Sequence, residues 1–197
     1  ESYWSIPAGD PDARGGTWVP GPGLDFIDAL KDRFPEAKLI AEDLGEITDE
    51  VREVMRVSGL PGMAILQFAF GADSGNLYLP HNIIPNSVIY PGTHDNDTTL
   101  GWYRATDETT RDHFRRYFSV DGSVPQWDCI RAAYASVARL AVIPLQDLFN
   151  LGSEARMNCP GEAAGNWQWR YRSGQLDTLW RESAAYLRSL GELYHRL

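Results

Sequence analysis

Acidic side chains follow two apolar segments of this sequence and could carry out acid–base chemistry. Glu42 and Asp43 come directly after Leu39-Ile40-Ala41, and His94-Asp95-Asn96-Asp97 follows Val88-Ile89-Tyr90 after a short Pro-Gly-Thr bend. If both apolar segments are parallel strands of one sheet, their carboxyl ends open on the same rim, so both groups reach one substrate. Glycoside cleavage needs this layout, because one carboxylic acid protonates the leaving oxygen while a second carboxylate attacks or stabilises the positive sugar carbon.

Each of these groups also has a simpler interpretation. Glu42 and Asp43 could cap a helix in a surface turn, and Asp95 to Asp97 could form a plain turn, since Asn and Asp favour such positions. His94 could be a structural hydrogen-bond donor. A metal site built from Glu42, His94 and Asp95 is a further alternative, because carboxylate and imidazole together bind several divalent ions. No HxH or HExxH spacing supports that metal site.

The elements that must position these groups alternate between short apolar strands and helices. Continuously apolar strands are expected when both faces of a parallel sheet are covered, which predicts an α/β fold. Strands are predicted at 38–41, 62–68, 87–90 and 140–144. Helices are predicted at 24–34, 49–57, 98–104, 107–118, 126–138 and 176–193, and the Gly- and Pro-rich residues 1–23 predict a long ordered loop. A closed eight-stranded barrel typically needs about 250 residues, so these four strand–helix units supply about half of one.

The composition narrows the class of partner. Lys and Arg number 18 and Asp and Glu 27 in 197 residues, a net charge of −9, which argues against nucleic acid or an anionic membrane as the main partner. Aromatic residues make up 12%, including seven Trp, which fits both an ordinary core and stacking on sugar rings. Cys129 and Cys159 are too few for a disulfide scaffold and predict reduced thiols in a cytoplasmic protein. Neither a secretory leader nor a membrane-spanning segment is predicted, and the first residue, Glu1, suggests a piece of something longer.

Seven short motifs, in their order along the whole chain, resemble the amylomaltase family. These are the 4-α-glucanotransferases, or disproportionating enzymes, of the α-amylase superfamily. Any one motif is weakly specific, whereas the ordered set is highly specific. The motifs are Ser2-Tyr3-Trp4-Ser5-Ile6-Pro7-Ala8-Gly9, Trp18-Val19-Pro20-Gly21-Pro22-Gly23, Ile40-Ala41-Glu42-Asp43-Leu44-Gly45, Leu66-Gln67-Phe68-Ala69-Phe70, Gly92-Thr93-His94-Asp95-Asn96-Asp97-Thr98, Arg156-Met157-Asn158 and Gly165-Asn166-Trp167-Gln168-Trp169-Arg170.

The resemblance implies a (β/α)8 TIM barrel, of which residues 1–197 would be the C-terminal half of the catalytic domain, about strands five to eight, with loop insertions. It implies transfer of α-1,4-glucan segments to the 4-hydroxyl of an acceptor glucan or glucose by a retaining double displacement. The partners would be maltooligosaccharide donors and acceptors, with no nucleic acid and no membrane. No cofactor and no metal is implied.

The same resemblance assigns roles to individual residues. Glu42 matches the general acid/base at the end of the fifth strand, and Asp95 matches the carboxylate that stabilises the transition state after the seventh. His94 matches the histidine that bonds hydroxyls of the transferred sugar, while Asp43 receives no chemical role. Further substrate-binding candidates are Asn96, Asn158, Trp4 and Trp18, and Tyr3, Trp167 and Trp169 are additional candidates for stacking.

One departure from the family pattern concerns the nucleophile. The family carries it as an Asp in a segment reading roughly Arg-x-Asp-His-Phe-Arg-Gly-Phe, which would lie just upstream of Glu1. The isolated chain is therefore predicted to be inactive, and a half barrel is predicted to leave strand edges and an apolar inner face exposed until the missing N-terminal half covers them. Two alternatives stay open: an α-glucan hydrolase of the same superfamily, and a non-catalytic glucan-binding piece.

Overall fold

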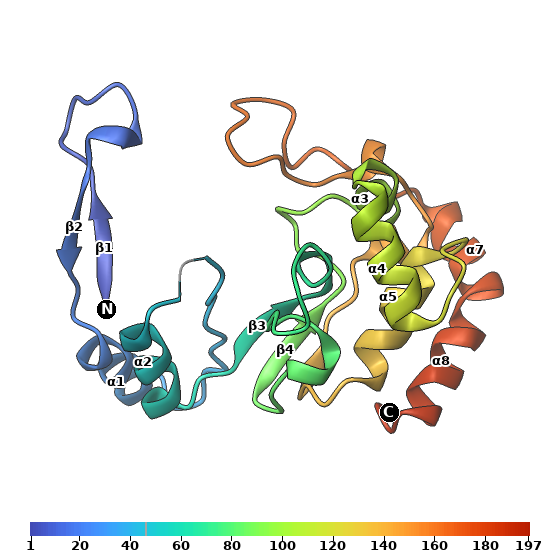
Figure 1. Cartoon of the computed structure of the whole chain (residues 1–197), viewed down its shortest axis with the longest axis horizontal. Coiled ribbons are helices and arrows are strands. Elements are labelled where there is room, and N and C mark those ends of the chain that lie inside the picture. Colours follow the sequence, from blue (N-terminus) through green and yellow to red (C-terminus); the bar gives the residue numbers. More distant parts are fainter. Residues whose placement is uncertain (46) are drawn as a thin grey trace. The chain divides into compact units, whose positions relative to one another are not determined.

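The computed structural model describes residues 1–45 and 47–197. The chain divides into two units, Glu1–Met63 and Ala64–Leu197 (Figure 1). The expectation that residues 1–197 belong to a single catalytic domain stays a prediction.

The first unit begins with an antiparallel hairpin of β1 (Ser2–Ser5) and β2 (Thr17–Pro20), in which Trp4 lies opposite Trp18. The Trp4 indole N–H donates to the carbonyl of Ala13 (2.7 Å), in the short 3-10 turn Ala13–Gly15. Gly16 lies so close to the Trp4 ring that a Cβ at this position would overlap it. The prediction of a long loop over residues 1–23 was therefore wrong, because cross-strand aromatic contacts order a hairpin despite the Gly and Pro content.

Two helices complete this unit, α1 (Leu24–Arg33) and α2 (Asp49–Ser58), and both were predicted within one residue of their bounds. The Thr48 hydroxyl caps α2 by accepting the N–H of Val51 (3.3 Å), and Gly59 ends the helix in the left-handed conformation (φ +65°). The Lys31 ammonium donates to the Ser58 carbonyl and so ties the end of α1 to the end of α2.

The predicted strand at 38–41 does not form, although all of its residues are described. Two hydrogen bonds tie this segment to the residues around the start of β3. The Ala41 N–H donates to the Pro61 carbonyl (2.9 Å), and the Asp43 carboxylate accepts the N–H of Met63 (2.6 Å). Only the first of these joins backbone to backbone, whereas a strand needs a repeated ladder of such bonds.

The three-stranded sheet has the order β3 (Gly62–Ile65), β4 (Ser87–Tyr90), β5 (Leu140–Ala141). β5 is parallel to β4, with Val88 opposite Leu140 and Ile89 opposite Ala141. β4 has the predicted bounds, whereas β3 ends early in a 3-10 turn (Leu66–Phe68) and β5 is only two residues long. Beyond β5, Pro144 is the N-cap of the short helix α6 (Leu145–Leu148).

Helices α3 (Thr99–Ala105), α4 (Glu108–Phe118) and α5 (Pro125–Ala135) follow the predicted pattern. The C-terminal helix, predicted as one, is divided at Ser183 into α7 (Ser173–Glu182) and α8 (Ala184–Leu193). Short 3-10 turns lie at Pro80–Asn82 and Ser153–Ala155. The core centres on Phe70, whose ring meets the edges of Phe114 and Phe118 at centroid distances of 5.1 and 5.3 Å.

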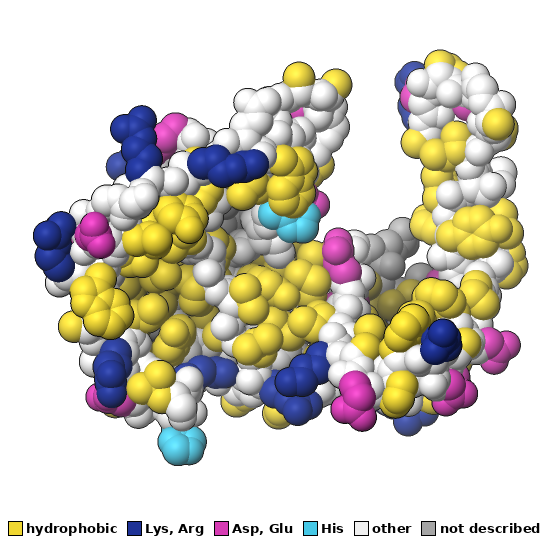
Figure 2. All heavy atoms as spheres, turned by 180° about the vertical axis from the view of Figure 1, so that it is seen from behind, with side chains coloured by type: hydrophobic (Ala, Val, Ile, Leu, Met, Phe, Trp, Pro, Cys, Tyr) yellow, Lys and Arg dark blue, Asp and Glu magenta, His cyan; other side chains and the backbone are white. Residues whose placement is uncertain are grey.

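Large apolar side chains also reach the surface of the second unit. Leu140 of β5 is 48% exposed and Val142, just after it, is 38% exposed. Figure 2 shows hydrophobic side chains gathered on one face, with few charged groups among them. Among the described residues, no helix has the length and apolar character needed to cross a membrane.

Candidate functional site

A tight turn after β4 presents Asp95 in the second unit. The Asn96 side-chain oxygen accepts the N–H of Thr93 (2.9 Å) and its hydroxyl (3.0 Å), and the Asn96 N–H donates back to the Thr93 carbonyl (3.2 Å). The Thr93 hydroxyl in turn accepts the N–H of Asp95 (3.3 Å). Asn96, predicted to bind substrate, therefore uses its amide oxygen to hold the turn and can offer a ligand its Nδ2 group.

A segment from beyond β5 holds this turn from the other side. Asn158 Nδ2 donates to Asp95 Oδ1 (2.6 Å), and the Asn158 N–H donates to the His94 carbonyl (3.1 Å). Arg156 donates through Nη2 to the Asp95 carbonyl and through Nε to the Asn158 carbonyl, both at 2.8 Å. The structure thus brings together His94, Asp95 and Asn158, three of the candidate site residues. Sequence reasoning gave Arg156 no role, and its only signal was its place beside Met157 and Asn158 in one motif.

His94 and Trp167 form an open surface beside the Asp95 carboxylate. His94 Nε2 lies 3.3 Å from Asp95 Oδ1, and the two side chains are 53% and 46% exposed. The Trp167 ring lies 5.0 Å from the His94 ring, inclined by 38°, and is itself exposed. Trp167 is held in the left-handed conformation (φ +61°) and donates its N–H to the Met157 carbonyl (2.7 Å). A carboxylate, an imidazole and an aromatic face are thereby available together to a polyhydroxyl ligand.

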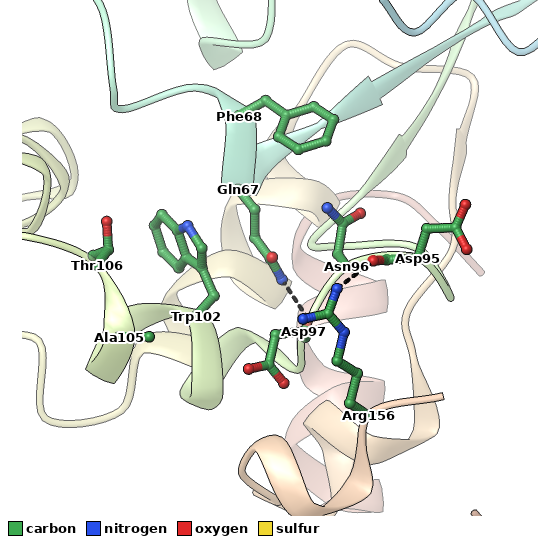
Figure 3. Close-up of a pocket in the computed structure, with 9 residues that line it drawn as sticks. All are labelled: Gln67, Phe68, Asp95, Asn96, Asp97, Trp102, Ala105, Thr106 and Arg156. Carbon is green, nitrogen blue, oxygen red and sulfur yellow. Dashed lines mark hydrogen bonds between the residues drawn. The ribbon is translucent and has the colours of Figure 1, made fainter. Parts of the chain in front are cut away.

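A cavity of about 340 Å³ lies against the same turn. Gln67 Nε2 donates to the Asp97 carbonyl (2.9 Å), and the Asp97 carboxylate accepts the Ser153 hydroxyl (2.6 Å). Figure 3 shows the Asp95 carboxylate pointing away from Gln67 and Trp102, although Asp95 is one of the residues that line the cavity. The cavity is lined by Gln67, Phe68, Asp95, Asn96, Asp97, Trp102, Ala105, Thr106 and Arg156.

Asp147, which sequence reasoning left without a role, holds the start of α3, the helix that follows this turn. Its carboxylate is 1% exposed and accepts both the N–H (2.8 Å) and the hydroxyl (2.7 Å) of Thr99, the first residue of α3. Burial raises the pKa of Asp147 to about 6, although the bonds from Thr99 oppose this shift. No pattern in the sequence joins residues 48 positions apart, so only the fold identifies this pair.

The remaining predicted site residues lie in the first unit. Glu42 is exposed, and its segment is held by the hydrogen bonds that its two neighbours, Ala41 and Asp43, form with Pro61 and Met63. Trp4 and Trp18 meet edge to face, with centroids 5.3 Å apart, and Trp18 is 68% exposed. Glu42 and Asp95 belong to different units, so their meeting around one substrate stays a prediction.

Among the described residues, no group of three or more His, Cys, Asp or Glu is arranged to hold a metal ion. Cys129 and Cys159 are both free thiols. Complete burial raises the pKa of the Cys129 thiol.

Comparisons with known proteins agree on one family. The family described as 4-alpha-glucanotransferase matches residues 1–177. The 4-alpha-glucanotransferase of Synechocystis is 46% identical over 199 residues, covering 100% of this chain and 39% of that protein. The Thermus thermophilus 4-alpha-glucanotransferase is 46% identical over 206 residues, covering 100% of this chain and 40% of that protein. Among solved structures, the amylomaltase of Streptococcus agalactiae in complex with acarbose superposes with a TM-score of 0.89 at 31% identity, covering 98% of this chain and 39% of that one.

The chain therefore spans about two fifths of the length of these relatives. The superposition shows that it has the α/β architecture of the corresponding part of amylomaltase. Since the family match extends over nearly the whole sequence, the chain belongs to the 4-alpha-glucanotransferase family.

Proposed function

We propose that the complete protein carrying this chain is a 4-α-glucanotransferase. It transfers α-1,4-glucan segments from a maltooligosaccharide donor to the 4-hydroxyl of an acceptor glucan or glucose, by a retaining double displacement. The observation that carries this proposal is the 46% identity, over the whole chain, to proteins named for this activity. The same names favour transfer over the alternative of an α-glucan hydrolase.

In the proposed mechanism, Glu42 donates a proton to the glucosidic oxygen as the bond breaks, and later removes one from the acceptor hydroxyl. The nucleophile is an Asp from a segment outside this chain. Asp95 hydrogen-bonds the donor sugar and stabilises the positive charge that develops on its ring, with its carboxylate oriented by Asn158. His94 bonds the sugar hydroxyls.

Transfer also requires that the acceptor glucan outcompete water at the intermediate. A glucan that covers the reacting carbon excludes water from it. The exposed ring of Trp167 beside His94, and the exposed Trp4 and Trp18 pair, are the surfaces on which glucan residues would stack.

We propose further that the chain supplies about strands five to eight of a (β/α)8 barrel. In this assignment β3, β4 and β5 are strands six, seven and eight, and residues 38–41 occupy the place of strand five. The position of Asp95 after the carboxyl end of β4 is the usual one for a catalytic group in such barrels. The exposed Leu140 and Val142 on and beside β5 are a surface that an N-terminal half would cover.

Replacement of Glu42 by Gln in the full-length protein tests the proposed acid/base. With maltotriose as substrate, we expect kcat to fall by about 10²–10⁴-fold, the usual contribution of a placed acid, while acarbose affinity changes by less than about threefold. Glu36→Gln removes another exposed carboxylate of the same unit and should leave kcat unchanged. Near-normal turnover by E42Q would remove Glu42 from the mechanism.

The isolated 197-residue chain provides a second test. We expect no redistribution of maltotriose into longer and shorter glucans, because the nucleophile lies outside the chain. Redistribution at a rate comparable with an intact homologue would refute this mechanism. Glucose release without redistribution would indicate a hydrolase. Acarbose binding without any turnover would indicate that the isolated chain is a glucan-binding piece.

A further inference from the structure

Arg156 joins the two segments that meet at the candidate site. Its Nη2 atom donates to the Asp95 carbonyl and its Nε atom to the Asn158 carbonyl, both at 2.8 Å, although Asp95 and Asn158 lie 63 positions apart in the chain. Figure 3 shows the guanidinium group pointing toward the Asp95 turn. A guanidinium group holds its donors in one rigid plane, so bonding both carbonyls fixes the position of one segment relative to the other.

The side-chain contact that depends on this position is the hydrogen bond from Asn158 to Asp95. Asn158 Nδ2 donates to Asp95 Oδ1 over a distance of 2.6 Å. The Asp95 side chain is 46% exposed, so its orientation depends on such polar contacts more than on packing. A shift of about 1 Å between the two segments would lengthen or break this bond, and a displacement of that size can cost an enzyme about 10²-fold in rate.

The segment that carries Arg156 is also anchored by bonds that do not involve the guanidinium group. The Ser153 hydroxyl donates to the Asp97 carboxylate (2.6 Å), and the Arg156 N–H donates to the Ser153 carbonyl (3.1 Å). The Gln146 side chain donates to the carbonyl of Ala155 (3.3 Å), which is itself buried. We therefore expect that losing the guanidinium group leaves the segment attached and the chain folded, but loosens the placement of the residues that follow it.

From these contacts we propose that Arg156 is a positioning residue, which acts through Asp95 and does not itself touch the sugar. It sets the placement of Asn158, and Asn158 aims the Asp95 carboxylate at the donor glucose. This inference rests on the proposed role of Asp95 in holding the donor sugar. Lysine replaces Arg156 only in part, since an ammonium group lacks the planar fork that bonds two carbonyls in fixed directions.

A double-mutant cycle on acarbose binding to the full-length protein tests whether Arg156 acts through Asp95. Calorimetry gives the dissociation constants of wild type, R156A, D95N and R156A/D95N. We expect Arg156→Ala to weaken binding by about tenfold or more in the wild type, but by less than about twofold in D95N, where no carboxylate is left to aim. Arg156→Lys should weaken binding by about threefold in the wild type. Arg104→Ala, which removes an exposed arginine of α3, is the matched control and should change the affinity by less than about twofold in both backgrounds.

Circular dichroism shows whether each variant is folded, and R156K takes the place of R156A in the cycle if R156A does not fold. Equal weakening by Arg156→Ala in both backgrounds would overturn the inference, because Arg156 would then contact the ligand directly or support the fold in general. Unchanged binding by R156A or by D95N, or no acarbose binding by the wild type, would also overturn it.

Redistribution of maltotriose by the wild type is measured separately. A wild type that gives the expected binding cycle but redistributes no maltotriose would contradict the proposed function and would still support the positioning role of Arg156. The two failures are therefore distinguishable.

Discussion

Asp147→Asn should stabilise the protein at neutral pH and have little effect at acidic pH. The asparagine has the same shape as the carboxylate, so its Oδ1 accepts the Thr99 N–H and its Nδ2 donates to the Thr99 hydroxyl in place of the two bonds to Asp147. The substitution thus keeps both bonds to the start of α3 and removes only the charge of a side chain that is 1% exposed.

The magnitude follows from the pKa of Asp147, which burial raises from 3.8 to about 6 in the folded protein, with a smaller contribution from the charge of Asp97. The folded state therefore binds this proton more tightly than the unfolded state does. The stability that comes from the protonated form is fully present below pH 3.8 and is lost as the pH rises through about 6. At about 1.4 kcal/mol per pH unit, the loss is about 3 kcal/mol.

Urea unfolding of wild type and D147N between pH 4 and pH 8 measures this loss directly. The free energy of unfolding of D147N minus that of the wild type should grow by about 2–3 kcal/mol over this range, with most of the change below pH 7. Asp177→Asn, at an exposed position on α7, serves as the matched control and should show a flat difference. A D147N difference that is independent of pH would refute the reasoning, because the carboxylate would then carry no excess cost of burial.

Two further predictions concern positions where the backbone depends on one side chain. Arg196→Ala removes a guanidinium that donates to four carbonyl oxygens at and just beyond the end of α5. We therefore expect the free energy of unfolding, measured with urea, to fall by about 2 kcal/mol or more, and the C-terminal helix to be cleaved earlier by a protease. If R196A and the wild type have the same free energy of unfolding, water replaces these hydrogen bonds at no cost. Gly122→Ala places a Cβ on the hydroxyl of Tyr103 in a residue with φ +77°, whereas Gly161→Ala, at φ +86°, meets open space. G122A should therefore lower the thermal midpoint by several degrees more than G161A, and equal effects would show that Tyr103 moves aside freely.

The helices of this protein could be predicted closely because their signals are local. Asp107 before α4 and Thr48 before α2 are capping side chains that act within one turn, and both appear in the structure as N-caps. Apart from the division of the C-terminal helix at Ser183, the main errors concern elements whose formation depends on a distant partner. The hairpin of β1 and β2 depends on Trp4 meeting Trp18 across 14 positions, and the apolar segment 38–41 lacks the ladder that would make it a strand.

The sequence by itself determined the family, most of the helices and the chemical types at the candidate site, because ordered motifs, helix caps and apolar patterns are local properties of the sequence. It also put His94, Asp95 and Asn158 among the candidate site residues, and the structure has these three in contact. Only the tertiary structure showed that Arg156 and Asn158 hold the Asp95 turn, and that the buried Asp147 bonds to Thr99 at the start of the helix that follows it. These properties depend on burial and on contacts between residues dozens of positions apart, which no local pattern encodes.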